Sequence, residues 1–174
     1  MDDTVQITDS DVVKNGNFTA IGISAWTYLC YVLQYRLFGM SAVGFHAVNW
    51  LLHTAVACVL FGFGRDFLKN RYSWHVAIFG ALLFAVHPLA SEIPNYVRTQ
   101  DLAWATLFSL LAAWALMLFL RDGHWLKLLG CGVCVLGATF SKGPGLAHAL
   151  MMCGAVGMVT MQLASWQCYA GNGG

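Results

Sequence analysis

LAWATLFSLLAAWALMLFL, residues 102–120, contains no charged side chain. Its length matches the roughly 20 apolar residues that an α-helix needs to cross the hydrocarbon core of a bilayer. The whole chain of 174 residues has the same character, because 59% of its residues are hydrophobic and 10% are charged. A soluble domain carries about 25% charged residues. The stretch therefore predicts a membrane-spanning helix in an integral membrane protein.

Four further apolar runs flank this stretch, and together they predict an all-α, polytopic transmembrane helix bundle of about five spans. The expected spans cover residues 41–64, 73–90, 102–120, 124–140 and 145–165. The aromatic segment 19–38 is less apolar, and we expect an interfacial amphipathic helix there, where Trp and Tyr are favoured; a sixth span is the alternative. The expected organisation is a loop with the interfacial helix (1–40), the transmembrane bundle (41–165) and a short polar tail (166–174).

The basic residues of short loops predict the orientation, because cytoplasmic loops carry an excess of Lys and Arg. Two loops that would share one side hold Arg65, Lys69, Arg71, Arg121 and Lys127. Most acidic residues lie on the opposite side, in the N-terminal segment and the loop 88–101. We therefore expect a non-cytoplasmic N-terminus and a cytoplasmic C-terminus, in a bacterial inner membrane or in the endoplasmic reticulum.

Polar residues recur within the first expected span. His46, Asn49 and His53 fall at i, i+3 and i+7, which places them on one helix face. Polar side chains are costly in lipid, so this face should line the interior of the bundle. Hydrogen bonding between helices and the lining of a polar cavity are equally open interpretations. Two histidines alone do not make a metal site, and we expect no metal.

Charged residues gather in three segments that the predicted topology places on the non-cytoplasmic side. These residues are Asp2, Asp3, His87, Glu92, Arg98 and Lys142. Lysine beside glycines at a helix start, as in Ser141-Lys142-Gly143-Pro144-Gly145, suits a phosphate group, which the positive charge and the helix dipole both favour. A solvated tail, a solvated loop and a lysine that extends to water are the structural alternatives.

These segments resemble a known family. DDTVQITDSDVVKNG (2–16), YRLFGMSAVGFHAVNWLLHT (35–54), LLFAVHPLASE (82–92) and FSKGPG (140–145) are similar, in this order, to motifs of GT-C type membrane glycosyltransferases. The resemblance is to the transmembrane and tetratricopeptide-repeat O-mannosyltransferases and their bacterial relatives. The chain departs from the family at Gln100, where an arginine is usual, and at Gly143, where an acid or proline is common. It resembles a piece of such an enzyme or a shortened descendant of one.

The resemblance implies transfer of a sugar, with mannose expected, from a polyprenyl-phosphate donor to an acceptor on the lumenal or periplasmic side. Asp2 or Asp3 would act as general base on the acceptor hydroxyl. Lys142 and Arg98 would stabilise the leaving phosphate. His87 and Glu92 would shape the pocket, and no cofactor is implied beyond the lipid-linked donor.

A non-catalytic transmembrane subunit of a larger complex is the alternative function. Expected partners are membrane lipid, the polyprenyl-phosphate sugar and, on the alternative, other membrane subunits. The net charge of +1 argues against nucleic acid, whose binders are strongly basic. A small transporter is a weaker interpretation, because no expected span carries a central acid and no inverted repeat is evident.

Overall fold

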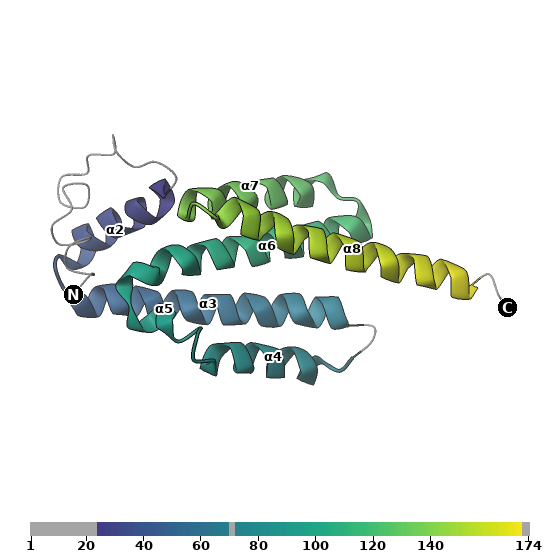
Figure 1. Cartoon of the computed structure of the whole chain (residues 1–174), viewed down its shortest axis with the longest axis horizontal. Helices are drawn as coiled ribbons and strands as arrows, with labels where there is room; N and C mark the ends of the chain where they lie inside the picture. The colour runs from purple at the N-terminus through teal and green to yellow at the C-terminus, as the bar shows by residue number, and fades with distance from the viewer. Residues whose placement is uncertain (1–23, 70–71, 172–174) are drawn as a thin grey trace.

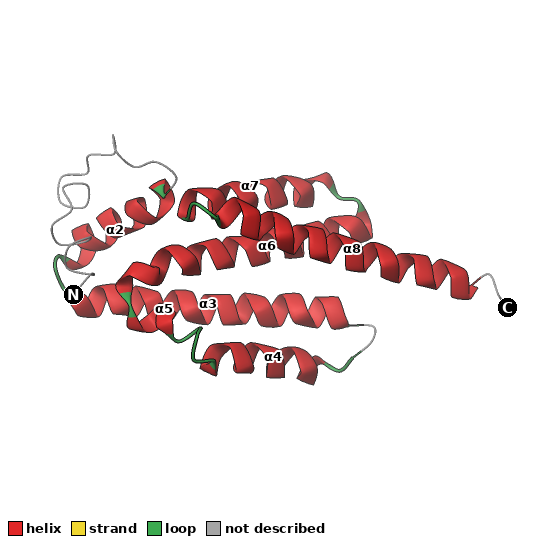
Figure 2. Cartoon of the chain, in the orientation of Figure 1, coloured by secondary structure: helices red, strands yellow, loops and turns green. Residues whose placement is uncertain are grey.

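A computed structural model describes residues 24–69 and 72–171, and in these ranges the chain is helical with no strand (Figure 2). The elements are α2 (Ala25–Phe38), α3 (Ala42–Leu68), α4 (Trp74–Val86), α5 (Glu92–Asn95), the 3-10 helix η3 (Val97–Thr99), α6 (Gln100–Asp122), α7 (Trp125–Ser141) and α8 (Gly145–Gly171). The prediction of an all-α bundle is confirmed.

Helix α6 forms the centre of the bundle. It packs against α3, α7 and α8, while α4 packs on the other side of α3 (Figure 1). The contact faces of α6 are rich in alanine, and Ala103, Ala105, Ala112 and Ala113 are at most 2% exposed. Small side chains let helix backbones approach closely, which is how membrane helices gain packing energy without a hydrophobic effect between them.

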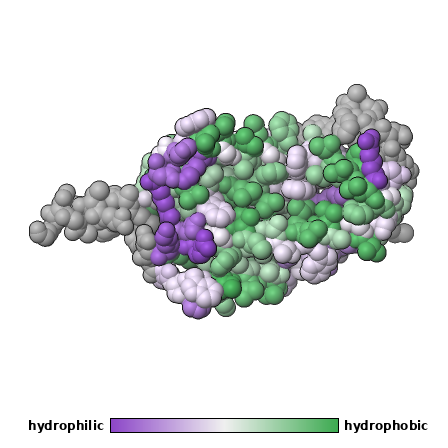
Figure 3. Space-filling view, turned by 180° about the vertical axis from the view of Figure 1, so that it is seen from behind, coloured by the Kyte–Doolittle hydropathy of each residue, from purple (hydrophilic) through white to green (hydrophobic). Residues whose placement is uncertain are grey.

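The outer surface of the bundle is apolar. Large hydrophobic side chains are exposed along several helices, including Val43 (79%), Leu51 (70%), Val86 (74%) and Met151 (73%). Figure 3 shows a broad hydrophobic band between two ends where hydrophilic residues gather. Among the described residues, Ala42–Leu68, Val97–Asp122 and Gly145–Gln162 are long and apolar enough to cross a membrane. The chain is therefore an integral membrane protein.

Two of the five expected spans are shorter helices. The run 73–90 forms the helix α4, which ends at Val86 and has 13 residues. This helix is about 20 Å long, whereas the hydrocarbon core is about 30 Å thick. It ends there because Pro88 disfavours helical geometry in the residue before it, and His87 adopts an extended conformation with ψ 132°. Helix α7 has 17 residues.

The aromatic segment 19–38 forms the helix α2 over its described part, Ala25–Phe38. Its outward face is apolar and its inward face carries polar side chains, the reverse of a surface helix of a soluble protein. Leu29, Leu33 and Leu37 are exposed, whereas Thr27 and Gln34 are buried against the bundle. The outward face of α2 therefore suits lipid, and its polar groups find their partners inside the protein.

Candidate functional site

Two of the three predicted charged segments, the loop after α4 and the turn between α7 and α8, lie at one end of the bundle. Helix α4 ends there, and a connection containing α5 and η3 leads into the start of α6 (Figure 1). The turn between α7 and α8, which carries Lys142, lies at the same end. Asp2 and Asp3 lie outside the described residues.

The polar face of α3 holds this connection by its backbone. His46 Nδ1 lies 3.1 Å from the carbonyl oxygen of Pro94, and Asn49 Nδ2 donates to Tyr96 O at 2.9 Å. One turn further along, His53 Nε2 lies 3.0 Å from Ala85 O, at the end of α4. These contacts give the carbonyls of Pro94 and Ala85 a side-chain partner, and Tyr96 O also accepts Thr99 Oγ1 at 2.7 Å. Of the two interpretations of this face, the contacts favour hydrogen bonding between segments.

A buried network of side-chain amides extends from the same face. Gln100 Nε2 donates to Asn49 Oδ1 at 3.0 Å, and Gln34 Nε2 donates to Gln100 Oε1 at 2.9 Å. Asn49 and Gln100 are fully buried. The network joins α2, α3 and α6, and through Asn49 it reaches the connection between α4 and α6. Gln100, the position where the resembling family carries an arginine, therefore serves helix packing in this chain.

Gln100→Leu should lower the stability of the bundle markedly. Leucine has a similar volume, but it leaves Gln34 and Asn49 with unpaired buried groups, and each such group costs about 1–3 kcal/mol. We expect a clear drop in the melting temperature in detergent. The matched control is Gln162→Leu, at an exposed position on α8. Equal melting temperatures for the two variants would contradict the role assigned to the network.

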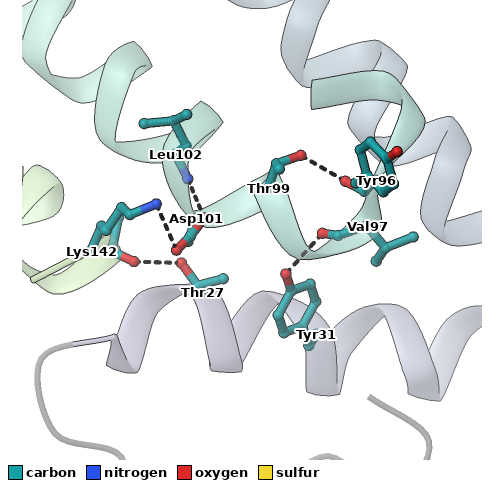
Figure 4. A network of polar contacts seen from close by, with 9 residues as sticks. Thr27, Tyr31, Tyr96, Val97, Thr99, Asp101, Leu102 and Lys142 are labelled. Atoms are coloured by element: carbon teal, nitrogen blue, oxygen red, sulfur yellow. Dashed lines mark hydrogen bonds and ion pairs between the residues drawn. The ribbon is translucent and has the colours of Figure 1, made fainter. Parts of the chain in front are cut away.

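Lys142 forms an ion pair with the first turn of α6. Its Nζ lies 3.3 Å from Asp101 Oδ2, and the two side chains are 34% and 27% exposed (Figure 4). The backbone beside Lys142 is also held, because Thr27 Oγ1 donates to Ser141 O at 2.9 Å. The lysine thus sits between α2, α6 and the start of α8. The sequence placed Asp101 in the charged loop but gave no signal that it would pair with Lys142.

The remaining predicted residues lie on the connection between α4 and α6. The side chain of His87 is exposed, and its Nδ1 accepts the backbone N–H of Leu89 at 3.2 Å. Glu92 and Arg98 are exposed, on α5 and η3. The structure therefore brings Lys142 against Asp101 and leaves His87, Glu92 and Arg98 around the same end.

Chemically, the end of the bundle offers cations and hydrogen-bond donors beside apolar helices. Among the described residues, no group of three His, Cys, Asp or Glu side chains is placed to hold a metal ion. An ammonium and a helix start in one turn suit an anionic group such as a phosphate. The bundle and this end together define a multi-span membrane protein with a candidate anion site at one membrane face.

Part of the chain is similar to known membrane-protein relatives. The chain is 33% identical over 135 residues to "Protein O-mannosyl-transferase Tmtc1" of Drosophila melanogaster, which covers 75% of this chain and 15% of that protein. It is 37% identical over 97 residues to "Protein O-mannosyl-transferase TMTC4" and 39% identical over 84 residues to "Protein O-mannosyl-transferase TMTC1", both of Homo sapiens. These matches cover 48% and 47% of this chain, and 13% and 9% of those proteins. The resemblance to the transmembrane O-mannosyltransferases is confirmed for part of the chain.

The chain spans a small fraction, 9% to 15%, of the length of these three relatives. No family model matches the chain, and no solved structure matches it.

Proposed function

We propose that this chain is part of a membrane glycosyltransferase that moves mannose from a polyprenyl-phosphate donor to an acceptor hydroxyl. The observation that carries the proposal is the similarity over 135 residues to a protein named as an O-mannosyl-transferase. The cation at one end of the bundle supports it, because a glycosyl phosphate donor releases an anionic phosphate.

The proposed reaction is a displacement at the anomeric carbon. The acceptor oxygen forms a bond to this carbon with inversion, and the bond from the carbon to the phosphate oxygen breaks with its electron pair going to the phosphate. Asp2 or Asp3 takes the proton of the acceptor hydroxyl as general base. The ammonium of Lys142 stabilises the negative charge that develops on the phosphate, and Arg98 provides a second cation.

In this proposal, Asp101 is the counter-ion of Lys142 in the absence of the donor. A half-buried ammonium without a counter-ion is costly, and the carboxylate 3.3 Å away balances it when no donor is bound. The donor phosphate then competes with Asp101 for the lysine. The start of α8, just after Lys142, adds its helix dipole to the attraction for the phosphate.

The charge distribution supports a lumenal or periplasmic site. Arg65, Lys69, Arg121 and Lys127 lie at or beside the ends of α3 and α6 and the start of α7, which form the other end of the bundle (Figure 1). Because cytoplasmic loops are enriched in basic residues, that end faces the cytoplasm and the Lys142 end faces the opposite side. The N-terminus is then non-cytoplasmic and the C-terminus cytoplasmic.

A non-catalytic transmembrane subunit is the second candidate. The observation that favours it is that Lys142 already has a partner in Asp101, so the pair could serve structure alone. In that case the exposed apolar helix faces would pack against other subunits.

Native mass spectrometry on the protein extracted gently from its own membrane separates the two functions. We expect a bound polyprenyl-phosphate lipid, which Lys142→Ala loses because the phosphate loses its cation. Lys127→Ala, at the other end of the bundle, is the matched control and should keep the lipid. Asp101→Asn should also keep it, since this variant breaks the ion pair but retains the lysine. Stable protein partners with no such lipid would indicate the subunit.

A further inference from the structure

A groove of about 560 Å³ lies on the outside of the bundle, next to the Lys142 end. Gly80, Leu83 and Phe84 of α4 form one wall, and Leu102 and Thr106 of α6 form the floor. Leu83 and Leu102 are 54% and 41% exposed, so the groove opens toward the hydrocarbon that surrounds the helices. Its shape and lining fit an apolar chain that enters from the bilayer.

One end of this groove is polar. His87, just after α4, and His148, in the first turn of α8, line it there. Because His87 Nδ1 accepts the N–H of Leu89 at 3.2 Å, its neutral ring carries the proton on Nε2, which is left to donate. None of the described residues that line the groove carries a carboxylate. An anionic oxygen therefore suits this end, while the rest suits hydrocarbon.

We propose that this groove binds the single apolar chain of the lipid-linked donor, with the donor phosphate at His87 and His148. This inference rests on the proposed function, because it assigns the lipid part of the same substrate. His148 lies one helical turn after the segment that carries Lys142, because its backbone N–H donates to Pro144 O at 3.1 Å. A phosphate at the histidine end would thus lie beside the turn that carries the lysine.

The groove can be filled without disturbing the helices. A Cβ atom at Gly80 would meet no other atom within 4 Å, so Gly80→Leu introduces a side chain at the groove without a clash at its first carbon. Gly154, on α8, has the same open space and does not line the groove. Gly154→Leu is therefore the matched control, with the same change of side chain on another lipid-exposed helix. Melting temperatures of both variants check that the bundle is intact, and Thr106→Trp fills the groove from its floor as a second variant.

The probe is a photoreactive polyprenyl phosphate without sugar, added to membranes that contain the full chain. We expect cross-links to peptides of α4 and the start of α6, loss of these cross-links in Gly80→Leu and Thr106→Trp, and their retention in Gly154→Leu. In His87→Phe/His148→Phe we expect that the probe no longer binds better than the matching photoreactive polyprenol. This readout needs no sugar transfer, so absence of transfer with intact labelling would count against the proposed function and not against the groove.

Three results would overturn the inference. The first is equal labelling of the two glycine variants. The second is equal competition by a diacyl phosphatidic acid, which would make the groove a general lipid surface. The third is capture of another polypeptide by a photoreactive residue at Leu83, which would show that a protein segment fills the groove.

Discussion

Asp2→Asn/Asp3→Asn should abolish sugar transfer and leave the bundle folded. An acceptor hydroxyl is a weak nucleophile at neutral pH, and an amide of the same shape cannot take its proton. General base catalysis contributes about 10²–10⁴-fold to the rate, so the double variant should fall to the background of the assay. The measurement is incorporation of labelled mannose from polyprenyl-phosphate mannose into acceptor protein in membranes.

The same N-terminal segment offers a control for the loss of two negative charges. Asp9→Asn/Asp11→Asn makes the identical chemical change a few residues further along the chain, and it should retain transfer. The two single variants Asp2→Asn and Asp3→Asn then assign the base to one residue. Full activity in the Asp2→Asn/Asp3→Asn variant would remove both aspartates from the mechanism. The role of Lys142 in binding the lipid is tested separately, by native mass spectrometry of Lys142→Ala.

The helices of this bundle could be predicted because their signals are local. The uncharged run 102–120 lies within α6, and the run 41–64 lies almost wholly within α3, since length and hydropathy alone decide that a segment prefers a helix in a membrane. The early end of α4 also had a local cause. Pro88 was visible in the sequence, but the apolar run continued past it, and we therefore expected a helix as far as residue 90.

The pairs that build the candidate site could not be predicted in the same way. Alternation of the spans correctly placed the loop after α4 and the turn carrying Lys142 at one end. The partners within that end depend on how helices distant in sequence pack. Gln34 meets Gln100 across 66 residues, and Thr27 meets the carbonyl of Ser141 across 114. A buried glutamine in an apolar segment signals that a partner exists, but it does not identify the partner.

Gly145→Ala should strongly destabilise the turn that carries Lys142. A Cβ atom at this position would lie 1.9 Å from the carbonyl oxygen of Ala138 and 2.7 Å from its carbon. These are backbone atoms of the last turns of α7, which cannot move aside as a flexible side chain can. The overlap is more severe than ordinary overpacking, which costs about 1–3 kcal/mol, so we expect at least this loss in the free energy of unfolding. The measurement is the melting temperature in detergent.

Gly143→Ala is the matched control, because it adds the same methyl group in the same turn. A Cβ atom at Gly143 would meet no other atom within 4 Å, and this residue has no positive φ. It should therefore melt at or slightly above the wild-type temperature, since alanine restricts the unfolded chain more than glycine does. The difference between the two variants isolates the close approach of α7 and α8 from any general loss of backbone freedom.

Gly145→Ala should also lose the bound polyprenyl-phosphate lipid, because the displaced turn carries Lys142 away from the phosphate. Equal melting temperatures and equal lipid binding in both variants would show that this contact does not hold the lysine in place.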